Sequence, residues 1–390
     1  MTLGDPVNYS ELMEIFSKPR PNGSAALQET KRALLAWLDR QNIPYTLKPF
    51  RIYPYFFECI GLWLILSRTL LAWAVWRRWG WLTLLIALAG LIGGIADVAL
   101  HWPLVTWFGS RIDENILIEF APNNPRQEII LSAHYDSKTE LLDHRQRMFF
   151  LKNLRVGMLL SLLIGALGLL DSGFFARGGP ESDGFHWLAL VLCVPLLFLA
   201  WGLGLNLSVG RLLQPSQGAV DNGAACAILL GLAARIAREA IATDHIRVTL
   251  ALFSGEEVNM QGSRAYVRER EWSMPAKAVN LEVMAQDGEY VYWERDGYSL
   301  RLVPTAEPLN QSVIQAITKV TGRPPIAAGP VNSDGYSFLA KGIPTATIGT
   351  YDRRLRDTGF HRPTDHLNRV VMARLEQGVE ILSQLLRDTG

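Results

Sequence analysis

The sequence predicts an α/β domain that is interrupted by two pairs of long apolar helices. Short runs of β-branched and aliphatic residues, typical of buried strands, alternate with helical patterns along most of the chain. Four further runs have about the length that crosses a bilayer, and they lie in two close pairs between residues 55 and 209. The net charge is only +1, so the composition gives no indication of nucleic-acid binding.

The soluble part reads as alternating helices and strands. Each expected strand is a buried apolar run, and each expected helix repeats its apolar residues with a period near that of an α-helix. The expected elements, in chain order, are a helix near residues 25–40, strands in PYTLKPF and NILIEF, strands at 127–136, 246–253 and 278–284, and helices at 310–320 and 371–386.

The apolar runs are predicted to be four transmembrane spans that form two hairpins. They cover residues 55–76, 81–102, 156–170 and 187–209. Tryptophans at several of their ends fit the interfacial belt of membrane helices. Buried core helices are the alternative, and Arg68 inside the first run supports it. Four such runs nevertheless exceed what one soluble core would bury, so we place the hairpins at 55–107 and 149–209.

Flanking charge predicts the orientation of these hairpins. Eight basic residues flank the soluble domain, and three lie at the far turns; they are Lys48, Arg51, Arg111, Arg145, Arg147, Lys152, Arg155 and Arg211, against Arg77, Arg78 and Arg177. The positive-inside rule therefore favours a cytoplasmic domain. The polar, acidic start of the chain does not resemble a cleavable signal peptide. Antiparallel pairing of the first two spans would put Glu58 at the depth of His101, with Asp97 close by. These three residues are therefore expected to form a structural cluster near the membrane surface on the side of the catalytic domain.

Two adjacent glutamates, Glu256 and Glu257, follow the strand at 246–253 after Ser254 and Gly255. The two glutamates cannot both be packing residues, so one of them must face a polar site. The end of a strand is where side chains of an α/β sheet reach its functional edge. One carboxylate could bind a cation while its neighbour handles a proton. A solvated pair at a helix start is the alternative.

Three other segments carry polar residues in comparable places. His134 and Asp136 end the strand at 127–136, where the carboxylate could orient the imidazole. Asp221 precedes a helix of small residues, as an N-cap or as a bridging ligand. Glu282 stands in an apolar strand, where a carboxylate is costly unless it is paired or metal-bound.

A last polar segment is the loop GFHRPTDH, which contains His361 and, four residues later, Asp365. In chain order the five segments resemble the M28 family of zinc metallopeptidases, which includes leucyl-type aminopeptidases, glutamate carboxypeptidase and glutaminyl cyclase. The family's succession of His-x-Asp, Asp-Asn-Gly, Glu-Glu, Asn-Leu-Asp and a late His is matched with Glu282 in place of the fourth Asp.

The resemblance implies a mixed-sheet zinc exopeptidase domain, an α/β/α sandwich, formed by residues 1–54, 108–148 and 210–390. It implies two Zn²⁺ ions bridged by Asp221, one completed by His134 and Glu282 and the other by Glu257 and His361. Glu256 would then be the general base, with Asp136 and Asp365 as supporting carboxylates.

Three departures from the family pattern bear on this assignment. Glu282 is one methylene longer than the usual Asp. The frequent Ser-Asp-His appears as Ser333, Asp334 and Gly335, without the imidazole, and Phe360 stands before His361 where some members have Tyr.

The primary functional hypothesis is a membrane-anchored di-zinc aminopeptidase that acts on peptides, including peptides close to the bilayer. The alternatives are a glutaminyl-cyclase-like acyltransferase with one zinc and a catalytically silent binding protein. The sequence gives neither the substrate side chain nor the oligomeric state.

Overall fold

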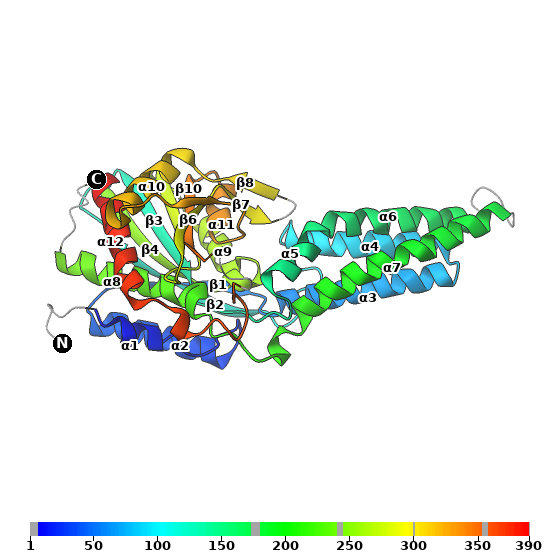
Figure 1. The fold of residues 1–390 in the computed structure, drawn as a ribbon, viewed down its shortest axis with the longest axis horizontal. Coiled ribbons are helices and arrows are strands. Elements are labelled where there is room, and N and C mark those ends of the chain that lie inside the picture. Colours follow the sequence, from blue (N-terminus) through cyan, green and yellow to red (C-terminus); the bar gives the residue numbers. More distant parts are fainter. Residues whose placement is uncertain (1–6, 173–179, 240–244, 299–300, 353–357, 390) are drawn as a thin grey trace. The chain divides into compact units, whose positions relative to one another are not determined.

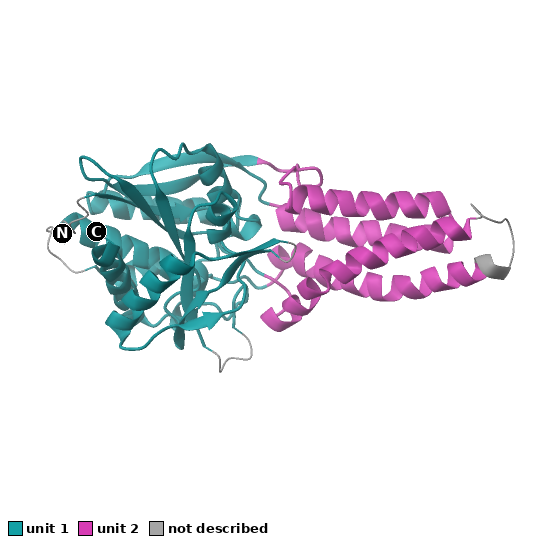
Figure 2. Cartoon of the chain, turned by 90° about the horizontal axis from the view of Figure 1, so that it is seen from above, with its two compact units in different colours: residues 1–54, 111–139, 214–390 teal, residues 55–110, 140–213 magenta. Residues whose placement is uncertain are grey.

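The computed structural model describes residues 7–172, 180–239, 245–298, 301–352 and 358–389. The chain divides into two compact units, shown in different colours in Figure 2. Unit 1 consists of Met1–Pro54, Arg111–Thr139 and Gln214–Gly390, and unit 2 consists of Tyr55–Ser110 and Glu140–Leu213. Unit 2 is thus formed by two insertions into the sequence of unit 1.

Unit 1 is built on an eight-stranded mixed sheet with the order β1-β2-β4-β3-β5-β10-β6-β9 (Figure 1). The strands are β1 (Thr46–Ile52), β2 (Arg111–Phe120), β3 (Gln127–His134), β4 (Ile246–Phe253), β5 (Ala276–Leu281), β6 (Glu289–Trp293), β9 (Ile326–Ala328) and β10 (Thr345–Tyr351), with a separate pair, β7 (Arg295–Tyr298) and β8 (Arg301–Pro304). Strands β4, β3, β5 and β10 run parallel to one another. An α/β domain with a mixed sheet is therefore observed, as predicted.

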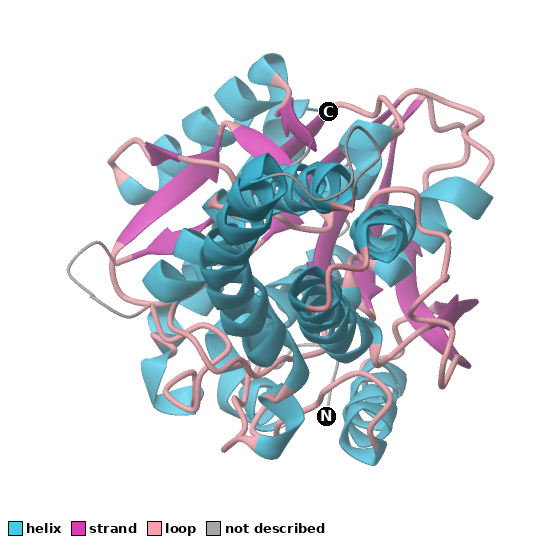
Figure 3. Ribbon diagram, turned by 90° about the vertical axis from the view of Figure 1, so that its right-hand side faces the viewer, coloured by secondary structure: helices cyan, strands magenta, loops and turns pink. Residues whose placement is uncertain are grey.

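Helices pack against both faces of this sheet (Figure 3). One face is covered by α1 (Tyr9–Glu14), α2 (Ala25–Arg40), α8 (Ala224–Glu239), α10 (Glu307–Thr321) and α12 (Met372–Thr389), and the other by α9 (Gln261–Glu269) and α11 (Gly335–Ala340). Within β2, Ile116 and Ile118 enter the first core while Leu117 enters the second. This alternation is the two-residue period of a strand buried on both sides.

Unit 2 is a helical bundle. Its helices are α3 (Phe56–Trp76), α4 (Gly80–Val98), α5 (His144–Lys152), α6 (Leu154–Asp171) and α7 (Pro180–Ser208), followed by the short turn η1 (Gly210–Leu212). A Cβ atom at Gly61 would lie 2.5 Å from the carbonyl oxygen of Gly204, so glycine lets α3 and α7 approach closely. Many large apolar side chains, including Leu66, Leu85 and Val194, point outward and are exposed.

Five helices in the described ranges are long and apolar enough to span a membrane. Four of these segments lie in unit 2, and the third extends over His144–Asp171, well beyond the predicted run. The fifth comprises Ala219–Glu239 and includes α8, but 94% of its most apolar 18-residue stretch is buried. Because α8 contributes to the core beside the sheet, its apolar character is explained by unit 1 itself.

Candidate metal centre

The carboxyl ends of β3, β4 and β5 bring three of the predicted site segments to one edge of the sheet. His134 ends β3 and is in register with Phe253, which ends β4. Glu256 follows β4 after Gly255, whose φ of 78° turns the chain sharply. Glu282 comes directly after β5, which ends at Leu281. The prediction that this strand extends to residue 284 was therefore wrong, and Glu282 lies in the loop beyond it.

Asp221 reaches the same edge from a tight turn, Ala219–Gly223, that precedes α8. The prediction of a helix N-cap was wrong, because α8 begins at Ala224 and the residue directly before it is Gly223, two positions after Asp221. The turn is held by Asp365, whose carboxylate accepts hydrogen bonds from the backbone N–H groups of Val220 (2.8 Å) and Asp221 (3.1 Å). Asp365 thus fixes the position of Asp221.

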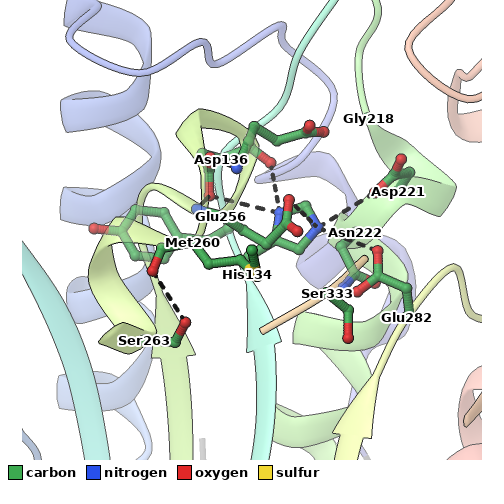
Figure 4. Close-up of polar contacts among 12 residues, drawn as sticks. His134, Asp136, Gly218, Asp221, Asn222, Glu256, Met260, Ser263, Glu282 and Ser333 are labelled. Atoms are coloured by element: carbon green, nitrogen blue, oxygen red, sulfur yellow. Dashed lines mark hydrogen bonds and ion pairs between the residues drawn. The ribbon is translucent and has the colours of Figure 1, made fainter. Parts of the chain in front are cut away.

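The predicted ligands converge as two triads that share Asp221. In the first, His134 Nε2 lies 3.3 Å from Asp221 Oδ1 and 3.6 Å from Glu282 Oε1. Figure 4 shows these three side chains pointing toward one another. In the second, His361 Nε2 lies 3.3 Å from Asp221 Oδ2 and 3.0 Å from Glu257 Oε1. The ligand atoms of each triad lie within 4.8 Å of one another.

Glu256 lies beside these triads without being needed by either. Its Oε2 is 3.9 Å from His134 Nε2. A combination of His134, Glu256 and Glu257 also meets the ligand spacing, so geometry alone permits Glu256 as a ligand. The two triads that share Asp221 use five side chains and leave the carboxylate of Glu256 available for other chemistry.

The donor set fits a divalent metal. His134 Nε2 and Glu257 Oε1 are buried and have no hydrogen-bond partner in the part of the chain that the structure describes. Buried polar atoms are nearly always satisfied, and several buried carboxylates that face one another require a cation. Imidazole and carboxylate are the ligands that zinc takes in catalytic sites.

Protonation within the site reflects the same crowding of negative charge. Burial alone would lower the pKa of His134, but the carboxylates of Asp136 and Asp221 outweigh it and raise the pKa well above its usual value. Burial raises the pKa of Glu256 well above its usual range; His134 opposes this effect and Glu257 adds to it. Ligands bind metal in their deprotonated form, so metal competes with these protons and binds more tightly as pH rises.

Asp136 contacts both His134 and the turn that carries the two glutamates. His134 Nδ1 lies 3.2 Å from the backbone oxygen of Asp136 and 3.5 Å from its carboxylate. The carboxylate accepts hydrogen bonds from the backbone N–H groups of Glu257 (3.0 Å) and Glu256 (3.4 Å) and from Asn22 Nδ2 (2.6 Å). Asp136 therefore holds the turn that carries the two glutamates.

Arg20 also contributes to the site, and it was not predicted from the sequence. Its side chain is fully buried, and the guanidinium donates to the backbone oxygens of Tyr135 (2.6 Å), Gly218 (2.7 Å) and Gln217. It therefore joins the segment after β3 to the turn before Asp221. The segment Pro19–Gly23 reads as a surface loop, and only long-range contacts reveal this role.

Two further residues lie close to the predicted ligands. Asn280 Nδ2 donates to Glu282 Oε2 (3.3 Å), and its own oxygen accepts from Ser132 Oγ (2.8 Å). Asp334 is completely buried, and burial raises its pKa to about 8 although nearby His134 lowers it. Asn280 was a possible signal, because it stands two residues before Glu282 in the expected strand, and alternate residues of a strand share a face.

Comparisons with known proteins show which fold the chain shares. The profile of Peptidase family M28 matches residues 206–386. A Zn-dependent exopeptidase from Parabacteroides distasonis is 14% identical, with a TM-score of 0.55 over 98% of this chain and 99% of that one. A zinc aminopeptidase from Bacillus subtilis is 12% identical, with a TM-score of 0.56 over 98% and 95%. Comparison with curated proteins gives no significant match.

Glutaminyl cyclases are similar to the chain to the same degree. The enzyme from Bacteroides thetaiotaomicron, solved with N-acetylhistamine, is 12% identical, with a TM-score of 0.55 over 98% of this chain and 99% of that one. At these identities the likeness establishes the fold. The resemblance of the sequence to the M28 peptidases is thus confirmed, and the chain has the α/β fold of the M28 zinc exopeptidases.

Proposed function

We propose that the protein is a membrane-anchored di-zinc exopeptidase, with aminopeptidase action as the primary hypothesis. The observation that carries the proposal is the carboxylate of Asp221, whose two oxygens face different histidines, His134 and His361, each at 3.3 Å. Such a bridge, with Glu282 completing one triad and Glu257 the other, is the arrangement expected for two metal ions about 3.5–4 Å apart.

The residues of the chain have distinct roles in amide hydrolysis. Zinc, when bound, lowers the pKa of water to about 7 and polarises the scissile carbonyl. Glu256 takes the proton of the attacking water and returns it to the leaving amine. A carboxylate beside the two triads, used by neither of them, is in a position to do this. Asp136 keeps Glu256 in place through its backbone N–H.

Metal content and substrate range test this proposal together. We expect about two zinc ions per chain, and hydrolysis of aminoacyl amides that a chelator abolishes and zinc restores. One zinc per chain with cyclisation of N-terminal glutamine would favour a glutaminyl-cyclase-like acyltransferase, a candidate supported by the equal structural likeness to such enzymes. Zinc binding without turnover of either substrate class would indicate a silent binding protein.

We further propose that unit 2 crosses the bilayer four times, with unit 1 in the cytoplasm. The support is the apolar outer surface of the bundle and the excess of basic residues on the flanks of unit 1. A reporter fused at Gly80, the first residue of α4, should be external, and one at the C-terminus should be internal. A translocated C-terminus would reverse the orientation.

The substrates are proposed to be peptides or protein ends close to the membrane. The support is connectivity: the second insertion leaves the chain after Thr139, five residues beyond His134, and returns at Gln214, seven residues before Asp221. A soluble dipeptide and a lipid-anchored peptide of the same sequence should be compared on the intact protein. Equal kcat/KM values for the two would contradict this substrate preference.

A further inference from the structure

Residues 99–110 of unit 2, here called the aromatic loop, connect α4 to β2 and contain no helix or strand. Five of their large apolar side chains are between 51% and 66% exposed; these are Leu100, Trp102, Leu104, Trp107 and Phe108. Exposed apolar groups that gather in this way usually mark a surface that contacts something other than water.

The aromatic loop is held in a defined shape by an acidic residue of α4. Asp97 is buried, and its carboxylate accepts hydrogen bonds from the backbone N–H groups of Leu104 (3.0 Å), Val105 (2.8 Å) and Thr106 (3.0 Å) and from the Thr106 hydroxyl. Non-helical backbone near the hydrocarbon region is tolerated only when its polar groups find partners within the protein. The Asp97 carboxylate is such a partner for three backbone N–H groups of the loop.

The loop also contacts Tyr55, just before α3, and Tyr55 in turn contacts a basic residue after α7. The ring of Phe108 lies 6.3 Å from that of Tyr55, just before α3. The guanidinium of Arg211, after α7, lies 4.8 Å above the Tyr55 ring and pairs with Glu58 at 2.5 Å. Aromatic and basic side chains at the ends of apolar helices are typical of the membrane–water interface.

We propose that the aromatic loop is a membrane-interface anchor, with Trp102, Trp107 and Phe108 inserted at the headgroup boundary of the bilayer that unit 2 crosses. The inference rests on the proposed membrane anchoring. The bilayer is the occupant because the loop continues the exposed apolar surface of α4, on which Ile92 and Ile95 face outward. Tryptophan rings prefer this interface.

The test uses nitroxide labels on the full-length protein in lipid nanodiscs. Trp107→Cys and Trp102→Cys place the label in the aromatic loop. Leu66→Cys, on the exposed face of α3, is the lipid reference, and Lys277→Cys, in β5, is the water reference. Accessibility to oxygen and to a water-soluble nickel chelate is compared. Because Cys59, Cys193 and Cys226 are not exposed, the unsubstituted protein gives the background.

We expect the labels at 102 and 107 to favour oxygen over the chelate, at a shallower depth than the label at 66. A label at 66 that reads as aqueous would contradict the membrane anchoring itself. If the label at 66 is deep but the labels at 102 and 107 are accessible to the chelate, the loop proposal fails while the membrane anchoring stands. The loop proposal also fails if both loop labels are shielded from both reagents, because that result indicates a contact with protein. Asp97→Ala should make position 107 more accessible to the chelate and leave position 66 unchanged.

Discussion

The metal centre of unit 1 and the bundle of unit 2 both contain acidic side chains with little exposure, but they satisfy them differently. In unit 2, Asp97 binds backbone N–H groups and Glu58 binds Arg211. In unit 1, Asp221, Glu257 and Glu282 face one another and two histidines. An acid that the chain itself satisfies is structural, whereas acids that converge without a cation indicate a ligand.

The largest expected effect separates the acid that performs chemistry from those that hold metal. Glu256→Gln should lower kcat by about 10²–10⁴, the range for positioned acid–base groups, while zinc content and folding are kept. Steady-state kinetics and metal analysis on the same preparation check this. The control is Glu269→Gln, an exposed glutamate of α9. Full activity of the Glu256 variant contradicts the assignment, and loss of zinc would mean that Glu256 is a ligand.

Arg20→Met should lower the free energy of unfolding by about 2–4 kcal/mol, because three carbonyl groups, two of them buried, lose their donor. Zinc affinity should fall as well, since the turn before Asp221 is released. Chemical denaturation and zinc titration measure both effects. Arg32→Met is the matched control, because Arg32 is exposed and donates to a carbonyl of its own helix. Equal effects of the two substitutions would show that Arg20 has no special role.

Asn280→Leu tests whether a ligand of the metal centre needs its hydrogen-bonded support. Residues that orient metal ligands typically contribute 10–100-fold in affinity, so zinc affinity should fall by about this factor. Ser132→Ala serves as the control, because it removes the other hydrogen bond of Asn280 and leaves Glu282 supported. A similar loss in both variants would place the effect in the packing of the sheet.

Most of the site could be predicted from sequence because strand ends are local features. His134, Glu256 and Glu282 each follow an apolar run, and parallel strands place such ends together. The conformation around Asp221 could not be predicted, because it depends on Arg20 and Asp365, each more than 140 residues away along the chain.

The same limit applies to the bundle. Its apolar helices were evident from composition, and Glu58, Asp97 and His101 were expected to cluster with one another, whereas the partners shown for Glu58 and Asp97 lie elsewhere in unit 2. Their identities were not predictable, since Arg211 is 153 residues from Glu58 and the amides bound by Asp97 belong to a loop without periodicity.

The smallest expected effect comes from the ion pair of unit 2. The side chains of Glu58 and Arg211 are 22% and 29% exposed, so solvent screens their attraction and Glu58→Gln should cost less than about 1 kcal/mol. Thermal unfolding in detergent should change little, and zinc content and kcat/KM should match the unsubstituted protein, because Gln keeps the size of the side chain and can still accept a hydrogen bond. A loss of zinc or a tenfold fall in activity would show that acids in unit 2 are coupled to the metal centre. The distinction between acids whose partners belong to the chain and acids that require a cation would then fail for this protein.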